Sequence, residues 1–277
     1  MIGLFPDPYP DELLYSICAR FQDRVKYPNQ ISVGRELFGV LVKASIDFPT
    51  HLGYLVANLP SQYCYTVDQL IDSHTLLPFY APFHPDKRIN SIRNAMAASD
   101  NPSIHGRLGI LSDEVKPAQW LRFCPLCGDQ DSKKFGELYW HRVHQLPGVE
   151  VCPTHLVFLE ISSVRTRDRK RPYTFISAAQ AIGKTSPRPL NILNSHDQIL
   201  LKIAEDAAWL LNQKYLVANL QSLYERYHFL LGSQGLTSPR GKLRGSEFIN
   251  SKPKSFLEAL PSKHFSQSQG YHKTTFC

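Results

Sequence analysis

Long hydrophobic runs are absent from this 277-residue sequence, because no stretch approaches the 18 or more apolar residues of a membrane span. The start of the chain, Met1 to Pro6, also lacks a basic region followed by an apolar one, so no secretory signal is expected. Cysteine is scarce, and outside the motif described below Cys18, Cys64 and Cys277 do not make a disulfide framework. We therefore expect a cytoplasmic protein that does not contact a membrane.

Several sequence signatures of enzymes are also missing. The chain has no glycine-rich phosphate loop ending in Lys-Ser/Thr, no nucleophile elbow and no His-Glu-x-x-His motif. Its acidic residues are scattered and do not suggest the buried carboxylate cluster of a two-metal nuclease or transposase. The alternative is an active site that only the folded chain assembles. We expect a protein that recognises or connects other molecules and is not an enzyme.

The positive charge is concentrated in the second half of the chain. The net charge is +7. Residues 1–120 hold 10 Lys/Arg against 12 Asp/Glu, residues 121–195 hold 11 against 6, and residues 196–277 hold 10 against 6. This asymmetry favours contact of the second half with a polyanion such as nucleic acid. The alternative explanation is solubility alone.

Four potential soft metal ligands lie in two pairs with matched spacing. Cys124-Pro-Leu-Cys127 is one pair, and Cys152-Pro-Thr-His155 is the other. Two intervening residues let a tight turn aim both side chains at one point, as a tetrahedral zinc site requires. The 24 residues between the pairs allow a hairpin or a short excursion. We predict one closed Cys3His zinc ribbon, and because four protein ligands leave no open position, the Zn²⁺ ion is expected to be structural.

Two alternatives to this ligand set remain. The cysteines can be buried free thiols that bind no metal. His141 and His144 also lie between the two pairs, but the first follows Trp140 directly and the second precedes Gln145-Leu146-Pro147-Gly148, a stretch with no partner knuckle. We interpret both as packing or surface histidines.

The first helix is predicted from apolar periodicity. An extended arm, Pro6 to Pro10, precedes Asp11 and Glu12, which we place in the first helical turn because carboxylates suit the helix dipole there. The apolar residues that follow have the spacing of one buried helix face: Leu14, Ile17, Cys18 and Phe21.

Three more helices are expected before residue 78. Ser32 is a candidate N-cap for a helix that ends at Gly39, and another helix is placed at 50–59. Thr66 and Gln69 have the form of a capping box, so a fourth helix should begin there. None of these four helices carries the cluster of Arg, Lys, Asn and Gln that reads base edges.

The segment 74–85 contains three prolines, so we expect it to lack regular structure. A further helix is expected at 88–98. Short helices joined by tight turns are typical of a helix-turn-helix domain, which we assign to residues 1–115.

Segments with strand composition, 120–123 and 156–161, flank the predicted zinc ligands. We assign a zinc-ribbon domain with a basic loop to residues 116–195. That loop is the densest cationic run in the chain and a candidate for phosphate contact, although such runs are usually solvated. Its cationic residues are Arg165, Arg167, Arg169, Lys170 and Arg171.

The last part, residues 196–277, is predicted to be a helical domain with a basic, partly mobile tail. Apolar periodicity indicates one helix around 200–211 and another around 216–227. Three tail residues are candidate nucleic-acid contacts: Arg240, Lys242 and Arg244. The expected fold class is therefore mainly α, with a small zinc-ribbon β element between two helical domains.

The order of these motifs resembles the TniQ/TnsD family of transposon target-selection proteins. The resemblance covers roughly residues 5–160. The matching pieces are Pro6-x-Pro8-Tyr9-x-Asp11-Glu12-Leu13, His74-Thr75-Leu76-x-Pro78-x-Tyr80-Ala81-Pro82, Phe123-Cys124-Pro125-x-Cys127, Gly136-Glu137-x-x-Trp140-x-Arg142, Leu146-Pro147-Gly148 and Cys152-Pro153-x-His155.

The resemblance implies a helix-turn-helix domain, a zinc ribbon and a helical C-terminal part. It also implies an adaptor role: the protein would link an RNA-guided CRISPR effector complex of the Cascade type, with its guide RNA, to a TnsC-like AAA+ ATPase that recruits the transposase to target DNA. Long family members instead read a chromosomal attachment site directly, and this TnsD-like, sequence-specific DNA binding is the alternative. The chain is shorter than the long members, which favours the adaptor.

Overall fold

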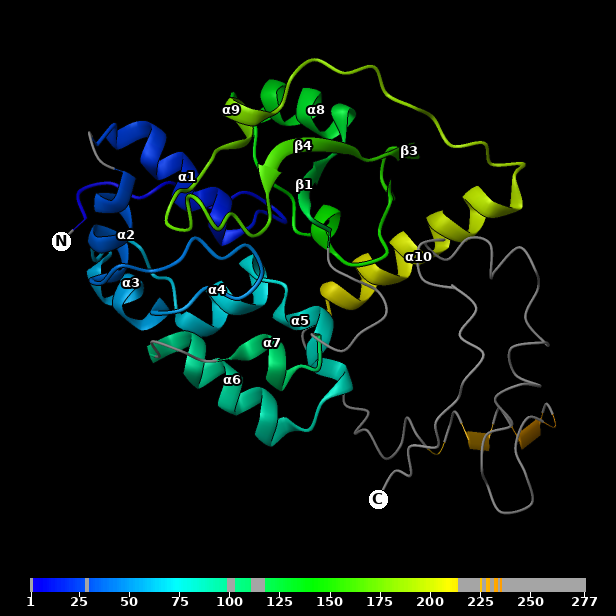
Figure 1. The fold of residues 1–277 in the computed structure, drawn as a ribbon, viewed down its shortest axis with the longest axis horizontal. Coiled ribbons are helices and arrows are strands. Elements are labelled where there is room, and N and C mark those ends of the chain that lie inside the picture. Colours follow the sequence, from blue (N-terminus) through cyan, green and yellow to red (C-terminus); the bar gives the residue numbers. More distant parts are fainter. Residues whose placement is uncertain are drawn as a thin grey trace.

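The computed structural model describes residues 2–27, 30–98, 103–110 and 118–213, together with six single residues between 225 and 235. This part of the chain is mainly helical and holds two small antiparallel sheets (Figure 1). No helix within it combines the length and the apolar composition that a membrane span requires.

The N-terminal half contributes a group of short helices. Their bounds are α1 Leu14–Val25, α2 Gln30–Phe38, α3 Leu52–Asn58, α4 Val67–His74, α5 Leu77–Tyr80, η1 Ala81–Phe83 (a 3-10 turn), α6 Asp86–Ala98 and α7 Ile104–Arg107. In Figure 1, α3 to α7 occupy the lower left, below the sheet of β1 (Trp120–Phe123) and β4 (Glu160–Arg165), and α1 lies to the left of that sheet.

The strands lie next to the predicted ligand pairs in the sequence, and β2 includes the ligand Cys152. Strand β1 (Trp120–Phe123) pairs antiparallel with β4 (Glu160–Arg165), and β2 (Val151–Cys152) pairs with β3 (Val157–Phe158). The strand composition noted at 120–123 and 156–161 is therefore confirmed, although the second segment divides between two sheets. Helix α8 (Pro125–Phe135) follows β1 directly.

Three further elements complete the described part: η2 Val143–Gln145, α9 Ala178–Ala181 and α10 Ser195–Leu211. Helix α10 contacts β2, η2 and α5, so it touches both the sheet region and the N-terminal helices. Its start is capped, because the Asn194 side chain accepts a hydrogen bond from the backbone N–H of His196 at 2.8 Å. The helix expected around 200–211 is confirmed, whereas the one expected around 216–227 lies outside the continuously described residues.

Local sequence signals explain where several helices begin and end. The apolar face predicted for α1 is buried, including Cys18, whose thiol pKa is raised by burial. Helix α4 has the predicted capping box, since the Thr66 hydroxyl accepts from the backbone of Gln69 and the Gln69 side chain accepts from the backbone of Thr66. Helix α2 stops at Gly39, which has a φ of +74°.

Three local predictions were wrong. Asp11 has a φ of +57° and Glu12 forms an isolated β-bridge with His141, so neither lies in a helical turn. Ser32 lies inside α2, which begins at Gln30, so it is not the N-cap of that helix. The segment 74–85 contains α5 and η1, because a proline is tolerated in the first turn of a helix, where its missing N–H would have no partner.

We expect Gly39→Ala to destabilise the protein by more than the left-handed backbone cost of about 1–2 kcal/mol. A Cβ at this position would lie 2.5 Å from the Tyr54 ring, so the ring would have to move. Gly109→Ala is the matched control, because Gly109 has a φ of +71° but a Cβ there would meet no described atom within 4 Å. Urea denaturation of both variants separates the cost of the steric clash from the cost of the left-handed backbone. Equal losses of stability in the two variants would mean that the Tyr54 ring moves aside at no cost.

Candidate metal centre

The structure brings the four predicted ligands together. Cys124, Cys127, Cys152 and His155 place one ligand atom each within 4.8 Å of all the others. The Sγ atoms of Cys127 and Cys152 are 3.7 Å apart, and the His155 Nδ1 atom lies 3.2 to 3.6 Å from the three sulfurs.

These distances fit a single tetrahedral metal ion. With metal–sulfur bonds of about 2.3 Å and metal–nitrogen bonds of about 2.0 Å, a tetrahedron separates two sulfurs by about 3.8 Å and a sulfur from a nitrogen by about 3.5 Å. The four ligand atoms therefore surround a single point. The four residues can hold one metal ion with no open coordination position.

The first pair owes its geometry to a helix start. Cys124 is the N-cap of α8, Pro125 occupies the first turn, and Cys127 follows one turn later. The backbone N–H of Cys127 points at the Cys124 Sγ atom at 3.4 Å. Such N–H contacts stabilise a thiolate, as does the positive end of the helix dipole.

The second pair is placed by a tight hairpin. Cys152 ends β2, and the chain returns through a turn in which the Leu156 N–H donates to the Cys152 carbonyl at 3.0 Å. Leu156 takes the left-handed conformation, with a φ of +54°. This turn carries His155 back over Cys152, and its outer nitrogen Nε2 donates to the side-chain oxygen of Gln130 at 3.1 Å. That hydrogen bond leaves Nδ1 as the free lone pair, as a metal ligand requires.

The thiols of the cluster share protons unequally. Hydrogen bonds from Cys124 and Cys127 lower the pKa of Cys152, whereas hydrogen bonds with Cys124 and Cys152 raise the pKa of Cys127. A bound cation would compete with the protons on these sulfurs, so metal binding is expected to release protons.

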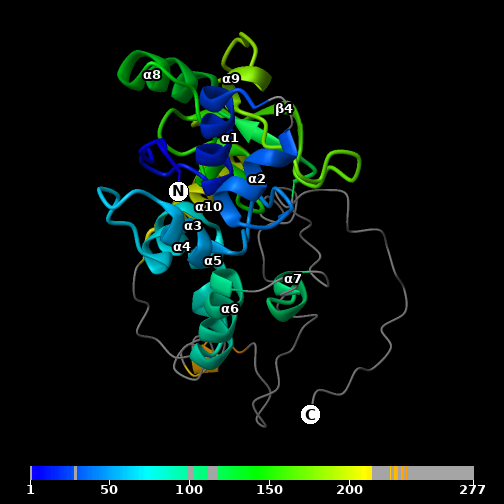
Figure 2. The same cartoon turned by 90° about the vertical axis from the view of Figure 1, so that its left-hand side faces the viewer.

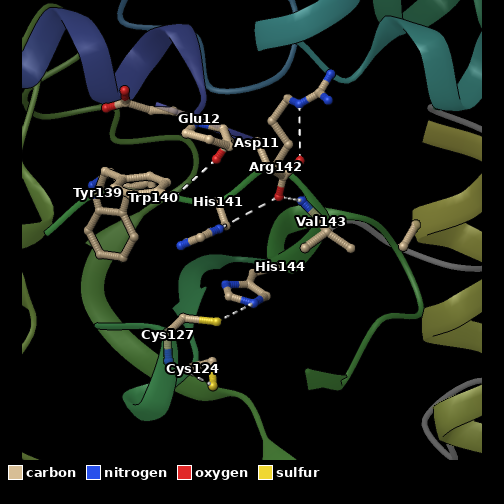
Figure 3. Close-up of polar contacts among 12 residues, drawn as sticks. Asp11, Glu12, Cys124, Cys127, Tyr139, Trp140, His141, Arg142, Val143 and His144 are labelled. Carbon is tan, nitrogen blue, oxygen red and sulfur yellow. Dashed lines mark hydrogen bonds and ion pairs between the residues drawn. The ribbon is translucent and has the colours of Figure 1, made fainter. Parts of the chain in front are cut away.

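His144, which we interpreted as a packing or surface residue, contacts the cluster from the protein interior. It is buried, and its Nε2 atom lies 3.9 Å from the Cys127 Sγ atom (Figure 3). Burial lowers the pKa of His144, so the ring stays neutral and can direct its N–H at the sulfur. The spacing of residues in the sequence does not distinguish a histidine that contacts a ligand sulfur from one that binds the metal.

His141 belongs to a second cluster that joins the N-terminal arm to the metal region. Its Nε2 atom lies 2.8 Å from the Asp131 carboxylate. Its Nδ1 atom lies 3.7 Å from the carboxylate of Asp11, and Figure 3 shows His141 beside Asp11. Burial alone would lower the pKa of His141, but the two carboxylates outweigh it and raise this pKa to about 9. Asp11 also accepts from the Arg142 guanidinium and the Val143 backbone N–H, both at 3.2 Å.

We expect this cluster to make the protein less stable as the pH rises. Because the folded-state pKa of His141 lies above its ordinary 6.5, its contribution is complete below pH 6.5 and is lost through pH 9. A shift of this size corresponds to about 3 kcal/mol. Urea denaturation at pH 6 and pH 9.5, with zinc saturating, should show a larger decrease for the wild type than for His141→Gln. Equal decreases would show that the imidazolium contributes nothing.

A third set of contacts holds the arm to the same region. Arg20 donates to the buried Glu12 carboxylate at 2.9 Å and also pairs with Glu137, while its guanidinium lies 3.8 Å from the centre of the Tyr9 ring. Burial raises the pKa of Glu12 to about 7, although Arg20 opposes the shift. Trp140 is fully buried and donates its indole N–H to the Ile176 carbonyl at 2.9 Å. Motif residues from the N-terminal arm and from the stretch around Trp140 therefore meet in one junction.

The basic loop after β4 lies elsewhere on the surface. The Arg165 guanidinium stacks over the Trp120 ring at 4.6 Å, and Arg171 pairs with Asp168 at 3.3 Å. The remaining cationic side chains make no ion pair within the described part of the chain: Arg167, Arg169 and Lys170. All five cations of the predicted loop are exposed. The other predicted contacts, Arg240, Lys242 and Arg244, lie outside the described residues.

Helix α6 carries a polar face that the sequence analysis did not single out. Arg93 pairs with Asp68 and Asp72 and so holds α6 against α4. The opposite side of α6 is exposed and carries Lys87, Arg88, Asn90, Ser91 and Asn94. These residue types read base edges. In the sequence, this face is indicated by the polar residues between the apolar positions Ile89 and Ile92.

Comparison with known proteins agrees with this arrangement. The family model described as TniQ matches residues 3–159, more than half of the 277-residue chain and a stretch that contains all four candidate ligands. The chain is also 36% identical over 162 residues to the Transposon Tn7 transposition protein TnsD of Escherichia coli. That similarity covers 56% of this chain but only 31% of TnsD. The chain therefore belongs to the TniQ family.

Proposed function

We propose that this protein is a target-selection adaptor of transposition. It would link an RNA-guided CRISPR effector complex of the Cascade type to a TnsC-like AAA+ ATPase that recruits the transposase. The observation that carries the proposal is the TniQ match over residues 3–159, which contains both the metal cluster and the arm that packs beside it. The similarity to a Tn7 transposition protein supports the same process.

In this proposal the metal is a structural Zn²⁺ ion. Three thiolates and one imidazole are the ligands that tetrahedral structural zinc sites use, and the four residues fill every position. The metal centre holds the region that connects the arm, the two sheets and α10. Its task is to keep the partner-binding surfaces in place.

The basic loop is proposed to contact nucleic-acid backbone without reading sequence. Its exposed arginines and Lys170 supply positive charge, but they lie in a loop and not along one helix face. Such contacts are strongly dependent on salt concentration. The assignment of a helix-turn-helix domain to residues 1–115, and the division at residues 116 and 196, also remain predictions.

A second function, direct reading of an attachment site, is favoured by the exposed face of α6. A helix of this length fits the major groove of DNA, and its Arg, Lys and Asn side chains are suited to base edges. In that case Asn90→Ala together with Asn94→Ala would reduce binding to one sequence and leave binding to others unchanged.

Fluorescence anisotropy separates the two functions. The purified protein is titrated at physiological salt with the attachment-site duplex of its element and with a scrambled duplex. Equal and weak binding to both, together with co-precipitation of the TnsC-like ATPase and the effector complex, is the result expected of the adaptor. Tight binding to the attachment site, commonly 10³-fold above the scrambled duplex, would make the protein a direct reader.

A further inference from the structure

A cavity of about 540 Å³ lies between the basic loop and the segment that precedes α3. One wall is the chain from Val164 to Pro172, and the other is the chain from Lys43 to Asp47. The two walls come from regions more than 100 residues apart in the sequence, and Figure 2 shows the loop after β4 projecting from the body beyond α2. We call this space the loop groove.

Backbone hydrogen bonds hold the walls of the loop groove in place. The Ala44 N–H donates to the Pro172 carbonyl at 2.8 Å, which joins one wall to the other. At the other end of the loop, Thr166 donates through its N–H to Gln119 at 3.0 Å and through its hydroxyl to Ala118 at 2.7 Å. The Asp168 carboxylate accepts from the backbone N–H groups of Lys170 and Arg171.

The rim of the loop groove carries unpaired positive charge. Lys43, Arg167 and Arg169 line it, are exposed, and make no ion pair within the described residues. Arg165 also lines it and stacks on Trp120.

The two carboxylates that line the loop groove are already engaged. Asp47 contacts His105 at 2.6 Å and accepts from the Ser45 hydroxyl at 2.9 Å. Asp168 pairs with Arg171 and with the loop backbone. The unbalanced charge that a ligand would meet is therefore positive.

The inner lining of the loop groove is apolar. It includes Tyr15, Ile46, Val164 and Ile176, of which the first three are buried. The Tyr15 hydroxyl accepts from the Ile176 N–H at 2.9 Å, so the polar end of this buried side chain is satisfied. Apolar lining beneath a cationic rim suits a ligand that carries phosphates next to a flat apolar group.

We propose that the loop groove binds a single-stranded segment of nucleic acid, with phosphates on the cationic rim and one base in the cavity. The proposal rests on the nucleic-acid contact of the proposed function and names its site and its ligand. A duplex is disfavoured, because its bases are stacked inside and reach such a cavity only after unstacking. A single strand presents its bases freely, and stacking or apolar contact with one base is largely independent of sequence.

The test is an anisotropy titration of the full-length, zinc-loaded protein with four fluorescent 12-mers of equal charge per strand: single-stranded DNA, single-stranded RNA, an abasic DNA strand, and the DNA annealed to its complement. We expect the two base-bearing single strands to bind about 10-fold more tightly than the abasic strand, as the loss of one base contact predicts. We expect the duplex to bind no more tightly than the abasic strand. The two base-bearing arms show whether the strand is DNA or RNA.

Variants locate the site. Lys43→Ala and Arg167→Ala, one on each wall, should each weaken single-strand binding about threefold to 10-fold, whereas the control Lys133→Ala, on the exposed side of α8, should leave it unchanged. All three positions are exposed, and zinc content together with thermal unfolding confirms that each variant is folded.

Several outcomes overturn the inference, and they differ from a failure of the proposed function. Equal binding of abasic and base-bearing strands, or a loss with Arg167→Ala but none with Lys43→Ala, would leave phosphate contact by the loop and remove the groove as a base site. Displacement of the labelled strand by an acidic peptide of equal charge at lower concentration than by unlabelled strand would assign the groove to a protein partner. If no strand binds at all, the nucleic-acid contact of the proposed function fails as well.

Discussion

Cys127→Ser is expected to cost the protein its metal ion and to unfold the region between β1 and β4. A serine oxygen does not replace a thiolate at a tetrahedral zinc site, and the Cys127 Sγ atom lies 3.7 Å from the Cys152 sulfur and 3.2 Å from the His155 nitrogen. Structural zinc contributes about 10–16 kcal/mol in small zinc modules, which is as large as the whole stability of a typical domain. Zinc content and far-UV circular dichroism of the purified variant measure both effects.

The control for this substitution is Cys64→Ser, because Cys64 is an exposed free thiol far from the cluster in the sequence. We expect this variant to keep its zinc and its thermal midpoint. A Cys127→Ser protein that kept one equivalent of zinc and its folded spectrum would contradict the four-ligand assignment, and His144, 3.9 Å from the same sulfur, would then be the residue to test as a substitute ligand.

Arg142→Ala is expected to destabilise the protein by about 3–5 kcal/mol, the usual cost of breaking a buried ion pair. Arg142 is buried and pairs with Asp11 at 3.2 Å. It also donates to the backbone carbonyls of Asp72 at 2.8 Å and Thr75 at 3.3 Å. One guanidinium therefore joins the N-terminal arm, the end of α4 and the metal region, and its loss leaves a carboxylate and two carbonyls with fewer partners.

Arg93→Ala is the matched control for Arg142→Ala. Arg93 also bridges two carboxylates, Asp68 and Asp72, but this pair lies at the surface, where ion pairs contribute about 0–1 kcal/mol. Urea denaturation midpoints of the two variants should differ accordingly. Arg142→Lys should be intermediate, because it keeps the charge but loses the fork that reaches three oxygens. Equal losses for Arg142→Ala and Arg93→Ala would mean that the junction is solvated in solution.

Local patterns in the sequence predicted the structure correctly wherever that structure depends on residues close together in the chain. The capping box at Thr66, the left-handed stop at Gly39 and the apolar face of α1 depend on neighbours within four residues, and each was predicted correctly. The two ligand pairs belong to the same class, because a spacing of two residues fixes the geometry within each pair. The resemblance to the TniQ family rested on the order of such local motifs.

Errors arose where distant contacts override local preference. Asp11 and Glu12 have the composition of a first helical turn, yet Asp11 pairs with Arg142, which is 131 residues away, and Glu12 is buried against Arg20. These buried ion pairs involve more energy than the interaction of a carboxylate with the helix dipole, on which the prediction of a helical turn was based. The prolines of 74–85 were read as breakers, although Pro78 occupies a position at the start of α5 where proline is favoured.

The sequence by itself determined the four candidate ligands, the limits of several helices and the family, because these depend on residue type and short spacing. Only the tertiary structure decided that the arm locks onto the metal region, that His144 lies against a ligand sulfur, and that Lys43 faces the basic loop across a cavity. The physical reason is the same in each case: a buried ion pair, an N–H to sulfur contact and a groove all require two segments to approach, and sequence spacing carries no information about which distant segments will meet.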